Sequence, residues 1–120
     1  MRALRALRGA TTADANTAEA IGDATAELVG AMLADNGVGT SDIVSIIFTA
    51  TEDLDAAFPA AAARRLGLTN VPLMCATEMA VVGSLRRCIR VLMHLYSERD
   101  YASLRPVYLR GAAGLRDDLP

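Results

Sequence analysis

The residues of this sequence that could do chemistry are mostly arginines. Arginine is permanently charged, and its planar set of N–H donors matches carboxylate and phosphate groups. All 12 basic residues are arginine, but codon usage in an alanine-rich chain explains such a count, so positions matter more than number. The candidates for an anion-binding site are Arg8, Arg64, Glu78, Arg90, Tyr108 and Arg116.

Arg90 is the most informative candidate because it lies in an alternating segment. Two sets of residues alternate there: Ile89, Val91, Met93 and Leu95, and Cys88, Arg90, Leu92 and His94. This period of two predicts a strand with two faces and places Arg90 and His94 on the same face. A cation among apolar neighbours needs an acceptor. That acceptor is a ligand or, in a purely structural ion pair, Glu78 or Asp53.

Glu78 has three possible roles: a general acid or base, an acceptor for a ligand hydroxyl, or the partner of a nearby arginine. The sequence around Glu78 does not separate these roles. Nucleophilic catalysis by Cys75 would need an adjacent base, and His94 is the only histidine of the chain. Two isolated residues do not make a catalytic dyad, and a single histidine argues against a metal site.

Composition restricts the class of protein. The length of 120 residues fits a single domain over residues 1–120. Although 52% of the residues are hydrophobic, no apolar run approaches the roughly 20 residues of a membrane span. The net charge of −2, without blocks of like charge, argues against nucleic acid as a partner. The N-terminus lacks the features of a secretory signal, so we expect a cytoplasmic protein.

The first half of the chain predicts two strands and a long helix. Residues 2–8 alternate loosely and end at a glycine followed by small polar residues, which predicts a strand with Arg8 at its end. Thr17 can cap a helix that ends at Asn36–Gly37. The β-branched and aromatic run Ile43–Ala50 predicts a buried strand.

The second half predicts a short helix and further strands. Pro59 opens a short helical segment that ends at Gly67. Residues 71–74 are extended, and the alternating strand follows. A short strand at 107–109 leads to a charged C-terminus whose final residues we expect to be loose. These elements predict an α+β fold, a mixed β-sheet packed against one long and one short helix. The other face of the sheet would need cover, which self-association would provide.

Several short motifs follow one another in a fixed order. They are Arg8–Thr12, Ala50–Leu54, Phe58–Ala60, Val71–Pro72, Cys75 with Glu78–Met79, Cys88–Val91, Val107–Leu109 and Leu115–Asp117. In this order the chain resembles the monofunctional chorismate mutases of the AroH class over essentially its whole length. The resemblance implies a homotrimer whose sheets form a pseudo-α/β barrel, with active sites between subunits. It also implies cofactor-free conversion of chorismate, a dianion, to prephenate in phenylalanine and tyrosine biosynthesis.

The resemblance further implies roles for individual residues. Arg90 and Glu78 would be catalytic: Arg90 would contact the ether oxygen and a carboxylate, and Glu78, with Cys75, would face the ring hydroxyl. Arg8 and Tyr108 would bind a carboxylate.

Five other residues would complete the cleft by resemblance. Phe58 and Leu115 would enclose the ring of the substrate. Arg64 and Arg116 would lie at the mouth of the cleft. The main chain at Met74 would border the ligand.

Two positions depart from the family pattern. Ala61 stands where relatives can carry lysine, and Met74 stands where a small hydroxyl residue is expected. Two other functions stay open from the sequence. One is an imine-hydrolysing deaminase of related trimeric architecture, and the other is a ligand-binding trimer without catalysis.

Overall fold

The computed structural model describes residues 1–118, with the side chains of residues 1–115. Its elements in chain order, with η for a 3-10 helix, are β1 (Ala3–Thr12), α1 (Ala18–Asn36), η1 (Thr40–Asp42), β2 (Ile43–Ala50), η2 (Pro59–Leu66), β3 (Leu73–Thr77), β4 (Cys88–Ser97), β5 (Val107–Tyr108) and η3 (Arg110–Asp118). None of the helices within residues 1–118 is long and apolar enough to cross a membrane.

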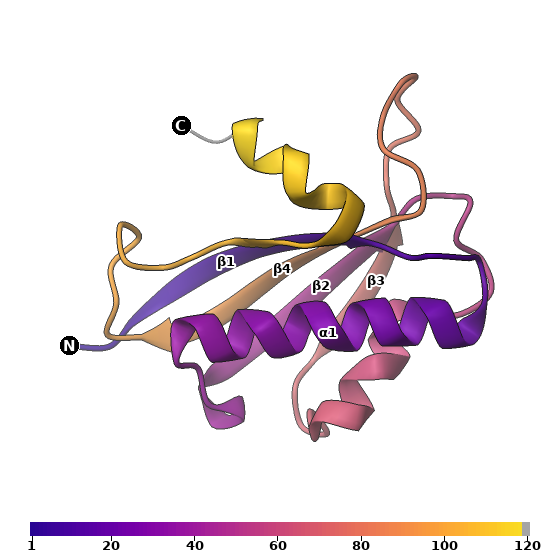
Figure 1. Ribbon diagram of the computed structural model, residues 1–120. Helices are drawn as coiled ribbons and strands as arrows, with labels where there is room; N and C mark the ends of the chain where they lie inside the picture. The colour runs from indigo at the N-terminus through magenta and orange to yellow at the C-terminus, as the bar shows by residue number, and fades with distance from the viewer. Residues whose placement is uncertain (119–120) are drawn as a thin grey trace.

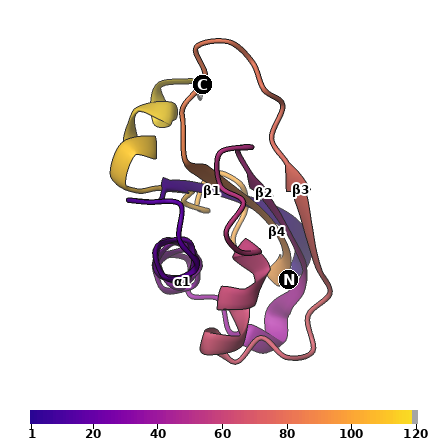
Figure 2. The same ribbon diagram turned by 90° about the vertical axis from the view of Figure 1, so that its right-hand side faces the viewer.

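The strands form one five-stranded sheet in the order β3-β2-β4-β1-β5. Strand β4 is antiparallel to both β1 and β2, whereas β5 is parallel to β1 and β3 is parallel to β2. Helices α1 and η2 lie on the same face of this sheet, which we call the core face (Figures 1 and 2). The predicted mixed sheet with one long and one short helix is therefore confirmed.

Helix α1 forms where its capping residues predict it. The Thr17 hydroxyl accepts a hydrogen bond from the Ala20 N–H at 3.1 Å, and Gly37 ends the helix with a φ of 62°. Glycine adopts this left-handed conformation without the steric cost that a Cβ imposes. The apolar side of α1 is buried against the sheet through Ile21, Leu28 and Met32.

Close contact between β1 and α1 depends on Gly9. A Cβ atom at Gly9 would lie only 2.5 Å from the sulfur of Met32, so the buried Met32 side chain would have to shift. Gly9 therefore allows the strand to approach the helix. Because neighbouring residues of a strand point to opposite faces, Arg8 projects away from α1.

Two sequence expectations need correction. Strand β1 continues to Thr12 instead of ending at Arg8, because residues 10–12 pair with residues 88–90 of β4. Arg8 therefore lies inside a strand, opposite Leu92. Strand β3 begins at Leu73, later than the extended segment predicted at 71–74. The sequence did not predict η3, which covers residues 110–118, and the final residues 119–120, which we expected to be loose, lie outside the described residues.

The face of the sheet opposite α1, here called the outer face, has little cover. Figure 2 shows η3 on this side of β1, while α1 and η2 lie on the other. In β4 the side chains at 89, 91, 93 and 95 are buried against the core, whereas Arg90, Leu92 and His94 are only half-buried. The predicted alternation is confirmed over residues 89–95, where it directs Arg90 to the outer face, whereas Cys88, predicted on the same face as Arg90, is buried.

Candidate active site

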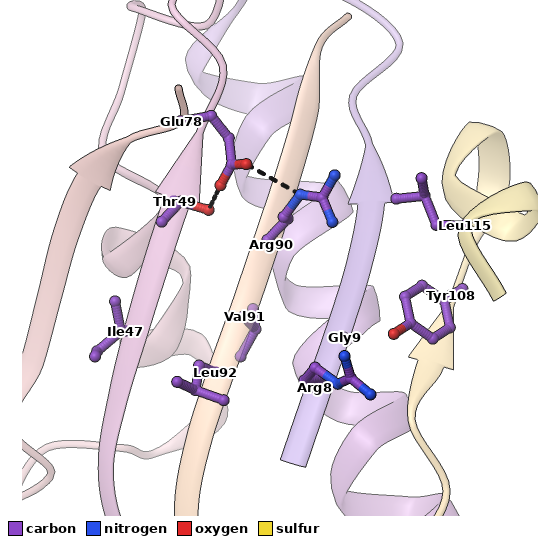
Figure 3. Close-up of a pocket in the computed structure, with 10 residues that line it drawn as sticks. All are labelled: Arg8, Gly9, Ile47, Thr49, Glu78, Arg90, Val91, Leu92, Tyr108 and Leu115. Atoms are coloured by element: carbon purple, nitrogen blue, oxygen red, sulfur yellow. Dashed lines mark hydrogen bonds and ion pairs between the residues drawn. The ribbon is translucent and has the colours of Figure 1, made fainter. Parts of the chain in front are cut away.

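A cleft of about 370 Å³ lies on the outer face of the sheet, within the size range of small-molecule sites. Strands β2, β4 and β1 form its floor, and β5 and η3 form one wall (Figure 3). We call it the Arg90 cleft. It is lined by Arg8, Gly9, Ile47, Thr49, Glu78, Arg90, Val91, Leu92, Tyr108 and Leu115.

Glu78 and Arg90 form an ion pair at one end of the Arg90 cleft. The Glu78 Oε1 atom lies 3.1 Å from Arg90 Nε, and Oε2 accepts a hydrogen bond from the Thr49 hydroxyl. Thr49 lies directly opposite Arg90 in the pairing of β2 with β4. The Glu78 N–H donates to Ala50 O at 2.8 Å, which fixes the backbone that carries the carboxylate. Of the two partners left open for Arg90, the structure selects Glu78.

The ion pair leaves most of the Arg90 guanidinium available to a ligand. Its Nε atom is buried and close to Glu78, but the N–H is not aligned for a hydrogen bond. Figure 3 shows the guanidinium pointing from β4 toward β1 and Leu115, across the cleft. Among the described residues, its N–H groups have no hydrogen-bond acceptor. A guanidinium with unused donors in a cleft is an anion-binding group.

Arg8 and Tyr108 lie at the other end of the cleft. Arg8 is exposed on β1, and Tyr108 follows from β5, which pairs with β1 at Gly9 and Ala10. Figure 3 shows the two side chains near each other and turned toward the cleft. Within residues 1–115 neither side chain makes a hydrogen bond. With Arg90, the cleft therefore offers two cations and a phenol against one carboxylate, which suits a ligand with two negative charges.

Four predicted site residues lie outside the Arg90 cleft on this chain. Cys75 and Phe58 line a separate hollow near the end of β2, and Phe58 also lines a second hollow with Arg64. Met74 is on the outer face of the edge strand β3 and is 63% exposed. Phe58 is 75% exposed, a high value for a large apolar side chain.

The remaining predictions have mixed outcomes. The structure brings five of the predicted residues together in the Arg90 cleft: Arg8, Glu78, Arg90, Tyr108 and Leu115. Arg116 belongs to η3, but its side chain lies outside the described residues. Ile47, Thr49 and Leu92 were not predicted. The sequence predicted β2 as a buried strand, so its two faces were not distinguished. Alternation within β2 could have identified Thr49, because Thr49 and Ile47 point to the same face of the sheet.

The two cysteines offer no activated nucleophile. Cys88 is buried, and this burial raises the pKa of its thiol. Cys75 packs partly against the core. His94 lies on the outer face and contacts the Ser45 hydroxyl, with 3.2 Å between its Nδ1 atom and Ser45 Oγ. Among the described residues, no group of three or more potential metal ligands occurs.

Comparison with known proteins identifies the family of the chain. Residues 4–119 match the family described as Chorismate mutase type I. The chain is 48% identical over 117 residues to the chorismate mutase AroH of Thermus thermophilus, covering 97% of this chain and 96% of the relative. It is 40% identical over 117 residues to the chorismate mutase AroH of Bacillus subtilis, covering 97% and 92%.

A solved structure supports the same assignment. The chorismate mutase from Clostridium thermocellum superposes with a TM-score of 0.88 at 52% identity, covering 90% of this chain and 96% of that chain. The similarity to the AroH class noted in the sequence is confirmed. The chain belongs to the type I chorismate mutase family, and it is a chorismate mutase, an isomerase.

Proposed function

We propose that this chorismate mutase converts chorismate to prephenate in the Arg90 cleft. In this rearrangement the ether C–O bond breaks while a C–C bond forms within the same molecule. No nucleophile is needed and no proton is transferred. The observation that carries the proposal is the Arg90 guanidinium, which faces the cleft with unused N–H donors beside Glu78.

Arg90 would stabilise the negative charge that builds on the ether oxygen as the C–O bond breaks. Only an interaction that is stronger in the transition state than in the bound substrate accelerates the reaction. A million-fold acceleration needs about 8 kcal/mol, and one preorganised donor to a developing oxyanion supplies about 3 to 4 kcal/mol. The remainder would come from holding chorismate in its reactive diaxial conformation.

Glu78 would have two tasks. Its ion pair with Arg90 orients the guanidinium, and the Thr49 hydroxyl holds the carboxylate in place. A carboxylate has enough lone pairs to accept a further hydrogen bond from the ring hydroxyl of the substrate. Glu78 therefore acts as an acceptor and an orienting group in this proposal, not as a general base.

Arg8 and Tyr108 would bind a carboxylate of chorismate at the far end of the cleft. Arg8 supplies a fixed charge, and the phenol of Tyr108 donates an additional hydrogen bond. Leu115, together with Ile47 and Leu92, provides apolar surface for the ring. This distribution of polar and apolar groups matches a small dianion with an unsaturated ring.

We further propose a homotrimer in which a neighbouring subunit completes each cleft. Each subunit would be a single domain over residues 1–120. The proposal is supported by the location of Phe58, Arg64, Met74 and Cys75, which are remote from the Arg90 cleft of their own chain. The exposed side chains of Phe58 and Met74 would then be covered by the partner and would border its ligand.

A mixing experiment tests the shared site. Arg90→Ala and Arg64→Ala chains are each expected to be poorly active. If the cleft is shared, refolding the two chains together restores part of the activity, because some mixed clefts contain both arginines. Activity that stays at the level of the separate variants, in confirmed mixed trimers, would contradict the shared cleft.

The activity itself is tested by the loss of chorismate absorbance with purified protein and no added metal or cofactor. Acid conversion of the product to phenylpyruvate identifies prephenate. Turnover is expected, and its absence from folded protein would overturn the proposal.

We also propose a cytoplasmic location, which the free thiols Cys75 and Cys88 support because reducing compartments keep thiols unpaired.

A further inference from the structure

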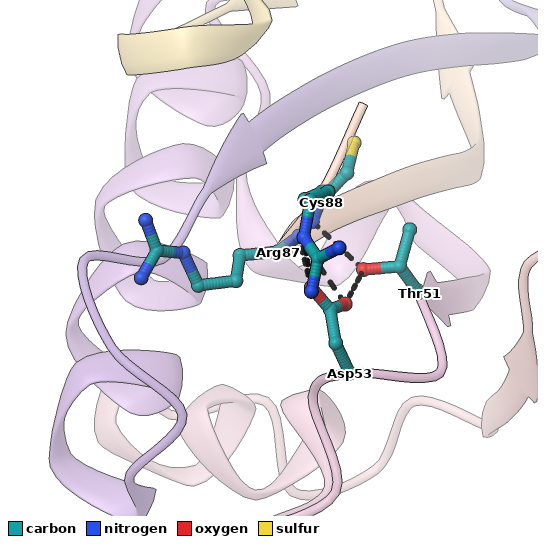
Figure 4. Close-up of polar contacts among 5 residues, drawn as sticks. Thr51, Asp53, Arg87 and Cys88 are labelled. Carbon is teal, nitrogen blue, oxygen red and sulfur yellow. Dashed lines mark hydrogen bonds and ion pairs between the residues drawn. The ribbon is translucent and has the colours of Figure 1, made fainter. Parts of the chain in front are cut away.

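A set of polar contacts between the end of β2 and the start of β4 is not explained by ligand binding. We call it the Asp53 network, and it consists of Thr51, Asp53, Arg87 and Cys88 (Figure 4). The two carboxylate oxygens of Asp53 accept the Arg87 N–H at 3.2 and 3.0 Å. Oδ1 also accepts a hydrogen bond from the Thr51 hydroxyl. Thr51 in turn is bonded to Cys88, since its hydroxyl oxygen accepts the Cys88 N–H at 3.0 Å and its own N–H donates to Cys88 O at 3.0 Å.

The Asp53 network holds an unusual backbone conformation. Arg87 has a φ of 47°, in the left-handed region that residues with a Cβ rarely adopt. Such a conformation persists only where surrounding contacts fix it. Here the carboxylate of Asp53 holds the Arg87 N–H, and the Arg87 carbonyl accepts the Ala13 N–H at 2.8 Å.

The charge of Arg86 is a minor part of this arrangement. Its Nε atom lies 3.7 Å from Asp53 Oδ2, but the Arg86 side chain is 86% exposed. Exposed ion pairs of this kind contribute little because water screens them. The main contacts of the Asp53 carboxylate are therefore the Arg87 backbone and the Thr51 hydroxyl.

The network lies next to both members of the Glu78–Arg90 pair. Arg87 directly precedes β4, and Arg90 follows three residues later on that strand. Glu78 begins the segment 78–87, and its N–H is bonded to Ala50 O. Both ends of this segment are thus attached to the stretch 50–53 at the end of β2. A change at Asp53 would remove the contacts of the Arg87 N–H at the end that leads into Arg90, while the bonds of Cys88 with Thr51 and of Arg87 with Ala13 remain.

We propose that Asp53 is a positioning residue for the chorismate mutase reaction. By fixing the left-handed turn at Arg87, Asp53 sets the direction in which the Arg90 guanidinium enters the cleft beside Glu78. Asp53 touches neither substrate nor Arg90 in this proposal, and it acts through the backbone of residues 87–88. The inference rests on the proposed function of the Arg90 cleft.

The variant Asp53→Asn tests the proposal. Asparagine keeps the size of the side chain and one carbonyl oxygen for the Thr51 hydroxyl, but it loses the negative charge, and its NH2 group at the position of Oδ2 cannot accept the Arg87 N–H. We expect kcat to fall about tenfold to a hundredfold, because small displacements of a catalytic group have effects of that order. The value of KM should change less, since Arg8 and Tyr108 stay in place.

Asp42→Asn is a matched control. The Asp42 carboxylate also accepts a backbone N–H, that of Gly39 at 3.2 Å, and forms an ion pair with Arg2, but Asp42 lies at the opposite end of β2 from Asp53. The Asp42→Asn variant should lose about as much stability as Asp53→Asn, while its kcat stays at the wild-type value. The assay is run well below the melting temperatures, with folding checked by circular dichroism.

The outcomes are distinct. A wild-type kcat in folded Asp53→Asn would overturn the positioning role. If Asp53→Asn does not fold, Asp53→Glu replaces it: this variant keeps the charge, but the longer side chain moves the carboxylate away from its position at the Arg87 N–H. A fall of kcat in folded Asp53→Glu would support the proposal, and an unchanged kcat would overturn it. A wild-type protein that does not turn over chorismate would instead overturn the proposed function, and this inference with it.

Discussion

The Oε1 atom of Glu78 lies 3.1 Å from Nε of Arg90, at the side of the guanidinium rather than across its terminal N–H groups. The pair therefore neutralises part of the charge of Arg90 and fixes its direction while leaving donors free for a ligand. A structural ion pair and a substrate-binding cation are usually alternative explanations for such an arginine. In this cleft one residue can satisfy both, because the carboxylate and the ligand would use different nitrogen atoms.

Glu78→Ala should reduce kcat/KM severely, by about a hundredfold, because the Arg90 guanidinium would lose the group that orients it. Glu78→Gln should be less damaging, since the amide oxygen can still accept one hydrogen bond. Steady-state kinetics on both variants measures the difference. Equal activity of Glu78→Ala and wild type would exclude an orienting role for the carboxylate.

Cys75→Ser should be mild. Replacing sulfur by oxygen at a half-buried position changes rates by no more than about threefold when no thiolate takes part in the chemistry. The measurement is kcat and KM for chorismate, with thermal unfolding as the check on folding. A loss of a hundredfold or so in folded protein would indicate covalent chemistry by this cysteine instead.

Arg110 connects the C-terminal helix to the body of the protein. It begins η3 with a φ of 50°, its Nε donates to Glu27 Oε1 at 3.1 Å, and its Nη1 lies 3.3 Å from Asp14 Oδ2. The hydrogen bond to Glu27 raises the pKa of Arg110, so its charge is present at every working pH. Because η3 carries Leu115 into the cleft, Arg110→Ala should raise KM for chorismate with little change in kcat.

The cost of Arg110→Ala to the free energy of unfolding should be no more than about 1 kcal/mol, since its partners are largely exposed. Arg105→Ala is the matched control, because Arg105 is exposed and its side chain makes no hydrogen bond among the described residues. Denaturant unfolding and steady-state kinetics give both quantities. An unchanged KM in Arg110→Ala would exclude a role of this anchor in shaping the cleft.

Asp53 predicts a specific dependence of stability on pH. The hydrogen bond from the Thr51 hydroxyl lowers the pKa of Asp53, and the Arg87 backbone N–H adds to this effect. A carboxyl whose pKa is lower in the folded state contributes stability above its unfolded pKa, and this contribution is lost as the pH falls through the folded pKa. The difference in unfolding free energy between wild type and Asp53→Asn should therefore shrink on acidification below about pH 5. A difference that stays constant with pH would contradict this reading of the network.

The sequence predicted the ends of elements correctly where a residue acts on the backbone next to it. Thr17 and Gly37 mark the ends of α1 because a hydroxyl cap and a left-handed glycine act on adjacent backbone. The alternation around Arg90 predicted the direction of its side chain for the same reason. The predicted end of β1 was wrong. Small polar residues alone indicate a loop, but residues 10–12 continue the strand because they pair with β4, far along the chain.

The parts of the site that depend on distant contacts could not be predicted from the residues alone. Helix η3 was missed because Gly111 and Gly114 suggest an irregular segment, whereas contacts with other elements hold it: Arg110 with Glu27, and the Gly111 N–H with the Thr12 hydroxyl at 3.0 Å. The choice of Glu78 over Asp53 as the partner of Arg90 likewise depends on where the segment 78–87 folds. No spacing in the sequence encodes that choice.

The most direct test of the account is the turnover of chorismate by Arg90 variants of the folded protein. The loss of chorismate absorbance is followed for wild type, Arg90→Ala, Arg90→Lys and the control Arg105→Ala. Arg90→Ala should lower kcat by at least about a hundredfold, and Arg90→Lys should restore little, because an ammonium is a point charge without the directed N–H groups of arginine. Near-wild-type turnover in folded Arg90→Ala would contradict the central claim that this guanidinium stabilises the transition state.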